Sequence, residues 1–125
     1  MFNVKFEDNE ARIGVFETRH GKIETPFFMP VATKLNVKLI APHELKKLNV
    51  DAVISNALLL YLKPGLDYVE KFKGIHKIMN YNGVIFTDSG GFQMISDDFL
   101  VDINEKKARF KDPHSGKLID MYPEK

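Results

Sequence analysis

The sequence GVIFTDSGGFQ at residues 83–93 joins a short apolar run to a polar loop. Three large apolar residues follow a turn-forming glycine, which is typical of a short buried strand. Where the run ends, Asp88 adds a carboxylate, Ser89 adds a hydroxyl, and Gly90-Gly91 lets the backbone take positive φ and approach a ligand closely. Phe92 then offers a flat apolar face. This set suits a planar ligand that forms hydrogen bonds, such as a nucleobase.

The composition indicates one globular unit. The chain has 125 residues, of which 44% are hydrophobic, and this suits one core and is short for two. The net charge of +1 argues against a histone-like protein but leaves room for a local basic face. Cysteine is absent, so this chain alone makes no disulfide and no thiolate zinc site. The N-terminus lacks an apolar signal region and no run approaches a membrane span, so we expect a cytoplasmic protein without membrane attachment.

The first 25 residues predict a small antiparallel layer. Apolar and polar residues alternate in three segments, 3–6, 13–18 and 21–25. Turn-forming residues at Asp8-Asn9 and at His20-Gly21 separate these segments. Pro26 would close the layer.

Strands and helices are expected to alternate after this layer. The predicted strands are 27–32, 51–56 and 84–86. The predicted helices are 41–48, where Leu45 and Leu48 share a face, and 66–80. An irregular segment is expected at 58–65, between the second strand and the second helix. This order is typical of a parallel sheet with right-handed crossovers. Thr33, Asn56 and Asp88 would then lie at the carboxyl ends of the strands, where ligands bind in α/β sheets and barrels.

The last part of the chain predicts a different structure. Three short strands are expected at 99–103, 107–111 and 117–120, with a tight turn at 112–116 and the first turn of a helix at 122–125. We therefore divide one partial domain into three parts. Residues 1–25 form the antiparallel strands, 26–93 the first β/α units, and 94–125 a β-rich insertion with the start of the next helix.

The loop TDSGGFQ at 87–93 resembles the signature loop of the tRNA-guanine transglycosylases, also called queuine tRNA-ribosyltransferases. Four further segments agree with this family in order and distance: 21–31, 55–65, 74–79 and 110–125. Five collinear segments are specific, whereas Asp-Ser-Gly-Gly alone would be weak. The resemblance implies an α/β fold that is the N-terminal part of a (β/α)8 TIM barrel. About three β/α units would follow the antiparallel layer and precede the insertion.

The resemblance also implies base exchange in tRNA. Family members replace guanine at the wobble position with a 7-deazaguanine (queuine, preQ1 or preQ0) through a ribosyl-aspartate intermediate. Asp88 matches the aspartate that recognises the base and acts as acid or base in the exchange. Ser89, Gly90, Gly91 and Phe92 match the base-binding loop, in which the ring of Phe92 stacks on the purine. Asn56 is retained on the second strand as a further substrate-binding residue.

Three family features have no counterpart in this sequence. The nucleophilic aspartate and the zinc site of three cysteines and a histidine are missing, and the family's Asn-Thr-Tyr-His reads Asn56-Ala57-Leu58-Leu59. A three-stranded piece of a barrel would also leave strand edges unpaired. We therefore expect a fragment or one half of a split enzyme. It would bind tRNA and a guanine-type base, use no metal or other cofactor of its own, and need a C-terminal partner chain or a homo- or heterodimer for activity.

Two other function classes remain open. One is a non-catalytic partner subunit or fragment that binds the base or tRNA without activity. The other is an unrelated α/β domain that binds phosphate or sugar, for which Gly90-Gly91 is a weak signal.

Single residues also have alternative roles. Asp88 could cap a helix, Phe92 could pack in the core, and Asn56 could satisfy loop backbone. The four histidines are expected to be structural or exposed. The basic residues of the last strands form either a tRNA-facing patch or a solvated surface, since acidic residues lie among them: Lys106, Lys107, Arg109 and Lys111.

Overall fold

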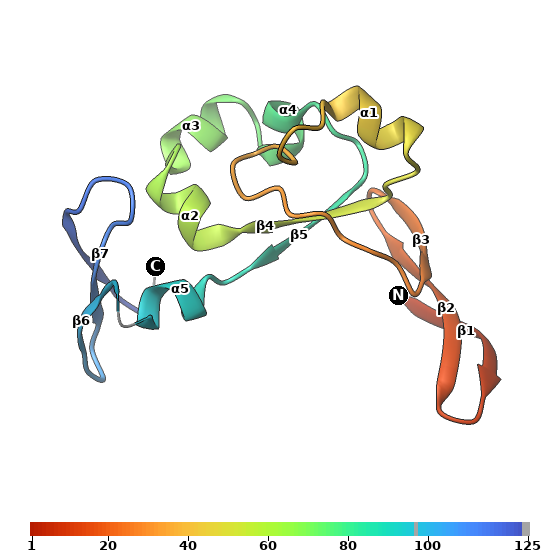
Figure 1. Cartoon of the computed structure of the whole chain (residues 1–125), viewed down its shortest axis with the longest axis horizontal. Helices are drawn as coiled ribbons and strands as arrows, with labels where there is room; N and C mark the ends of the chain where they lie inside the picture. Colours follow the sequence, from red (N-terminus) through yellow and green to blue (C-terminus); the bar gives the residue numbers. More distant parts are fainter. Residues whose placement is uncertain (97, 124–125) are drawn as a thin grey trace. The chain divides into compact units, whose positions relative to one another are not determined.

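A computed structural model describes residues 1–96 and 98–123 of the chain, which form two compact units, Met1–Asp88 and Ser89–Lys125. The elements of the first unit are β1 (Phe2–Asp8), β2 (Ala11–Thr18), β3 (Gly21–Thr25), α1 (Pro42–Lys47), β4 (Ala52–Asn56), α2 (Ala57–Leu62), α3 (Leu66–Lys71), α4 (Ile75–Met79) and β5 (Val84–Asp88) (Figure 1). Those of the second unit are α5 (Gly91–Ile95), β6 (Leu100–Ile103), β7 (Ala108–Lys111) and β8 (Leu118–Met121). The chain thus mixes helices with a small antiparallel layer and parallel strands.

The antiparallel layer is confirmed in its order β1-β2-β3. Phe16 of β2 pairs with Phe2 of β1 and with Ile23 of β3, so these three side chains lie on one face. Ile23 is buried and packs in one cluster with Ala52 and Val84, the first residues of β4 and β5. The layer is therefore held by apolar contacts at the amino ends of the parallel strands.

Strands β4 and β5 pair in parallel from Ala52 opposite Val84 to Asn56 opposite Asp88. The predicted strand at 27–32 is wrong as a full strand, because it is reduced to one parallel bridge between Val31 and Ile54. Proline has no N–H to donate to a ladder, and Pro26 directly precedes this segment while Pro30 lies within it. It is also less buried than we predicted, since Phe28 is 82% exposed.

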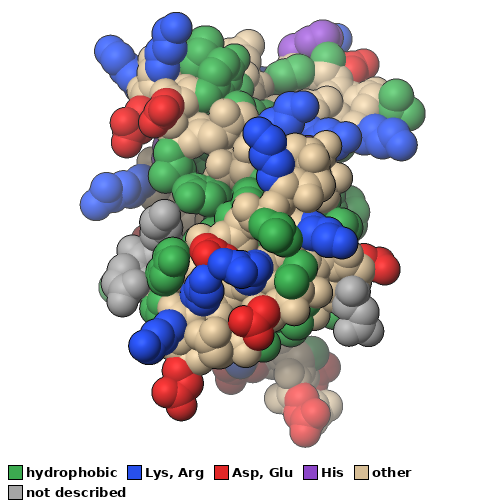
Figure 2. All heavy atoms as spheres, turned by 90° about the vertical axis from the view of Figure 1, so that its left-hand side faces the viewer, with side chains coloured by type: hydrophobic (Ala, Val, Ile, Leu, Met, Phe, Trp, Pro, Cys, Tyr) green, Lys and Arg blue, Asp and Glu red, His purple; other side chains and the backbone are tan. Residues whose placement is uncertain are grey.

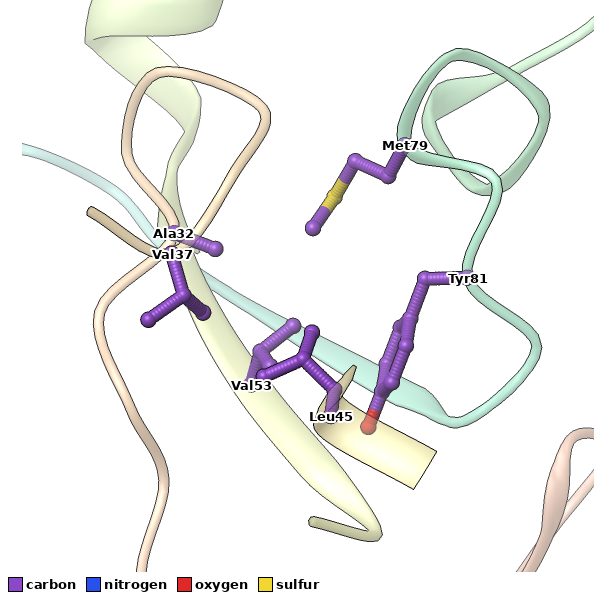
Figure 3. Close-up of a cluster of buried hydrophobic side chains, with 6 residues drawn as sticks. All are labelled: Ala32, Val37, Leu45, Val53, Met79 and Tyr81. Atoms are coloured by element: carbon purple, nitrogen blue, oxygen red, sulfur yellow. The ribbon is translucent and has the colours of Figure 1, made fainter. Parts of the chain in front are cut away.

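One core cluster joins α1, β4 and the chain before β5 (Figure 3). The buried side chains of this cluster are Ala32, Val37, Leu45, Val53, Met79 and Tyr81. The hydroxyl of Tyr81 donates a hydrogen bond of 2.9 Å to the carbonyl oxygen of Val50. Burial, with a smaller contribution from Asp51, raises the pKa of Tyr81 to about 12. The phenol therefore stays neutral at physiological pH and keeps its donor role.

The helices differ from the prediction in three places. The segment predicted to be irregular contains α2, whose Leu58 and Leu60 are buried. The single predicted helix at 66–80 is two helices, because Lys73 and Gly74 both take positive φ between α3 and α4. In α1, Leu45 is buried but Leu48 is 60% exposed, because the helix ends at Lys47.

The three strands predicted in the last part of the chain are confirmed, and they form an antiparallel sheet in the order β6-β7-β8. Phe110 of β7 is its most buried large side chain and faces Leu100 and Ile119 of the neighbouring strands. Of the helical turn predicted at 122–125, Pro123 lies in a turn and residues 124–125 lie outside the described residues. Among the described residues of both units, no helix has the length and apolar character that crossing a membrane requires.

Candidate functional site

Asn56 and Asp88 are the last residues of β4 and β5 and lie opposite each other in the parallel register. Parallel neighbouring strands end at the same edge of a sheet, so the predicted neighbourhood of these two residues is confirmed. The Asp88 side chain is exposed there. The alternative that Asp88 caps a helix is wrong, because the N-cap of α5 is Gly90 and Asp88 still belongs to β5.

Asn56 is buried and caps helix α2. Its Oδ1 accepts a hydrogen bond of 2.9 Å from the backbone N–H of Leu59. Its neighbour Ser55 is also buried and donates 2.7 Å to the carbonyl oxygen of Ala32, which ties β4 to the segment before Thr33. The structural role of Asn56 is thus confirmed. The sequence signal for this role is an Asn directly before an apolar run that forms a helix. Our prediction of an irregular segment at 58–65 did not use this signal.

This cap supports a stability prediction. Replacing Asn56 with Ala should lower the free energy of unfolding by about 1 kcal/mol, because the N–H of Leu59 loses its acceptor. Asn56→Asp keeps an acceptor oxygen at the same position and should cost less. Urea-induced unfolding measures both changes. Equal losses for the two variants would contradict the capping role.

The loop after Asp88 belongs to the second unit and includes one residue with positive φ. Gly90 takes a left-handed conformation with φ 73°, as we predicted for the glycine pair, whereas Gly91 already begins α5. The hydroxyl oxygen of Ser89 accepts a hydrogen bond of 3.3 Å from the N–H of Gly91. Phe92 is 79% exposed, so the alternative that it packs in the core is wrong. Its ring is free of the apolar contacts that a core residue would make.

The basic residues of the second sheet are partly neutralised. Asp120 accepts hydrogen bonds from Arg109 Nε at 2.6 Å and from Lys107 Nζ at 2.7 Å. These two partners hold the pKa of the Asp120 carboxyl well below its usual range. Figure 2 shows Lys and Arg side chains interspersed with Asp, Glu and hydrophobic ones on the face that it views. Of the two alternatives for these basic residues, the structure therefore shows the mixed surface, in which Lys107 and Arg109 form ion pairs with Asp120.

The residues of this chain do not fit the zinc site that the resemblance implies. The chain contains no cysteine. Within 1–96 and 98–123, no three His, Cys, Asp or Glu side chains come together to hold a metal ion.

The fold and the site define a mixed α/β protein in which an amide and a carboxylate stand at the carboxyl ends of two neighbouring parallel strands. The sequence profile of the family described as Queuine tRNA-ribosyltransferase matches residues 7–125. The chain belongs to this family, as its signature loop indicated.

Several curated relatives carry the name Queuine tRNA-ribosyltransferase. The protein of Latilactobacillus sakei subsp. sakei (strain 23K) is 45% identical over 115 residues, which are 92% of this chain and 30% of the relative. The protein of Thermoanaerobacter pseudethanolicus is 46% identical, and that of Staphylococcus aureus (strain JH9) 43% identical, over the same share of this chain. The chain thus spans about 30% of the length of these relatives.

Proposed function

We propose that this chain supplies the base-recognition part of a tRNA-guanine transglycosylase, which exchanges guanine in tRNA for a 7-deazaguanine. Membership of the family supports the reaction class. The observation that carries the proposal is the pairing of Asn56 with Asp88 at the carboxyl ends of β4 and β5, where the TDSGGFQ segment at 87–93 begins. Ligands of parallel α/β folds bind at this end of the strands.

In this proposal Asp88 recognises the purine edge and acts as acid or base. Guanine leaves poorly as an anion, so a proton or hydrogen bonds at its edge lower the barrier. The nucleophile is a carboxylate from a part of the enzyme outside these 125 residues. It attacks C1′ of the ribose, the bond from C1′ to guanine breaks, and a ribosyl-aspartate ester forms. The incoming 7-deazaguanine then attacks C1′ and releases the carboxylate, while the proton of its attacking nitrogen passes to a base such as Asp88.

The remaining strands of a (β/α)8 barrel would come from that same outside part, whether it continues this chain or belongs to a partner. Within the described residues, β5 pairs with β4 along one edge and with no strand along the other. An unpaired edge leaves N–H and C=O groups without partners, which a further strand would satisfy. This chain spans about 30% of the length of the relatives, so the rest of their length is enough for further strands. A partner chain in a homo- or heterodimer could supply these strands.

Phe92 provides a test of base binding that is separate from catalysis. Phe92→Ala should weaken binding of the base by about 5- to 150-fold in the completed protein, because stacking contributes about 1–3 kcal/mol per base. The ring is exposed, so stability should hardly change. Equilibrium binding of labelled guanine measures the effect. The matched control is Phe28→Ala, which removes another exposed ring; an equal loss in that variant would contradict the stacking role.

A second candidate is a subunit that binds base or tRNA without catalysing exchange, and the lack of a residue matching the nucleophile favours it. The two candidates separate in one assay. The chain is mixed with tRNA, labelled guanine and a polypeptide equivalent to the remaining part of a relative. Incorporation of label into tRNA supports the transglycosylase. Binding of guanine without incorporation supports the second candidate and overturns the first.

A further inference from the structure

Two histidines from distant parts of the first unit stack on each other. His20 lies in the turn between β2 and β3, and His76 lies in α4. Their ring centroids are 3.8 Å apart with an angle of 11° between the rings. The turn is fixed by Thr18, whose hydroxyl accepts from the N–H of His20 and donates to the carbonyl oxygen of Gly21, both at 3.0 Å. The hairpin therefore presents one imidazole face to the helix.

His76 also contacts the chain just before β5. Its Nε2 lies 3.1 Å from the carbonyl oxygen of Gly83, which can only accept a hydrogen bond. In the neutral ring the proton is therefore on Nε2, and Nδ1 is unprotonated. Burial, and then the neighbouring His20, lower the pKa of His76, while the Gly83 carbonyl acts in the opposite direction.

We propose that the His20–His76 stack is a proton-sensitive clamp, which joins the β2–β3 turn to α4 when the rings are neutral and releases it when they are charged. Two parallel imidazolium rings at this distance repel each other. The chain neighbours of the two rings, Arg19 beside His20 and Lys77 beside His76, are cations and do not offset that repulsion. On the hairpin, the carboxylate of Glu17 lies 2.6 Å from Lys22 Nζ.

The direction of the pH effect follows from the lowered pKa of His76. In the open state His76 binds a proton with its ordinary pKa of 6.5, whereas in the closed state its pKa is lower. The contact is thus fully formed above that value and weakens as the pH falls below it. One proton changes the ratio of closed to open forms by up to about tenfold per pH unit. This clamp goes beyond the proposed function, because it requires neither tRNA nor a partner.

Amide hydrogen exchange of the full chain between pH 7.5 and 5.5 tests the clamp. After correction for intrinsic exchange, opening of the β2–β3 turn and α4 should rise by up to about tenfold over this range. His76→Gln can still donate to Gly83 but does not titrate, so its profile should be flat. His43→Gln, outside the stack, should behave as the wild type. A flat wild-type profile, or an unchanged profile in His76→Gln, would overturn the proposal.

A second measurement covers the case in which His76→Gln does not fold. Titration of the ring nitrogens of His76 by NMR in the wild-type chain should give a pKa below 6.5. In His20→Phe, where the stack is kept and one charge is removed, that pKa should rise toward its ordinary value. A wild-type pKa of His76 at or above 6.5 would overturn the clamp.

Discussion

Replacing Asp88 with Asn should lower the rate of guanine exchange by about 100- to 10,000-fold when the chain is completed by the polypeptide proposed above. The amide keeps the size and part of the hydrogen bonding of the carboxylate but neither gives nor takes the proton. Since Asp88 is an exposed residue at the end of β5, the free energy of unfolding should change little. Incorporation of labelled guanine into tRNA measures the rate.

The matched control is Asp67→Asn. Asp67 is another exposed carboxylate of the first unit, in the first turn of α3. Its replacement changes the net charge by the same amount and should leave the exchange rate within about twofold of the wild type. Full exchange by Asp88→Asn, or an equal loss in both variants, would refute the role of Asp88 as acid or base.

Replacing Leu45 with Ala should lower the free energy of unfolding of the first unit by about 2–5 kcal/mol. Leu45 is 2% exposed and lies in the core cluster with Val53 and Tyr81. The cluster joins α1 to β4, so the cavity left by Ala would loosen the contact that holds α1 on the strands. Urea-induced unfolding followed by circular dichroism measures the change.

The same helix provides the control for this prediction. Leu48 follows α1 and is 60% exposed, so Leu48→Ala should change the free energy of unfolding by less than about 0.5 kcal/mol. Similar losses for Leu45→Ala and Leu48→Ala would contradict the observed packing of α1.

Strands with strong patterns could be predicted from the sequence. The alternation of apolar and polar residues predicted the antiparallel layer, and uninterrupted apolar runs predicted β4 and β5. The parallel order then predicted that Asn56 and Asp88 lie together, which the register confirms. In β3, β4 and β5 the apolar positions include the buried ones, among them Ile23, Val53 and Val84.

The errors arise where backbone hydrogen bonding and local conformation outweigh hydrophobic pattern. The segment 27–32 is apolar enough for a strand, but Pro30 cannot donate to the ladder and a single bridge remains. The helical stripe through 66–80 continues across Lys73-Gly74, whose positive φ values end α3 and let α4 start anew. Apolar periodicity carries no information about such breaks.

The site was predictable in part. Asp88 at the end of an apolar run and Gly90 with positive φ are both consequences of local sequence. The sequence does not predict the use of Asn56 as the N-cap of α2, because 58–65 is expected to be irregular. Exposure of Phe92 is not encoded in the residue itself, since most Phe side chains are buried.

The central claim is that these 125 residues carry the base-recognising carboxylate and that the nucleophile lies in a part of the enzyme outside them. Trapping the covalent intermediate tests it most directly: labelled tRNA is incubated with the completed protein without an incoming base, and the products are separated under denaturing conditions. We expect the label to migrate with the complementary polypeptide and to be absent from this chain. Label attached to this chain would show that the nucleophile lies here and would contradict the account.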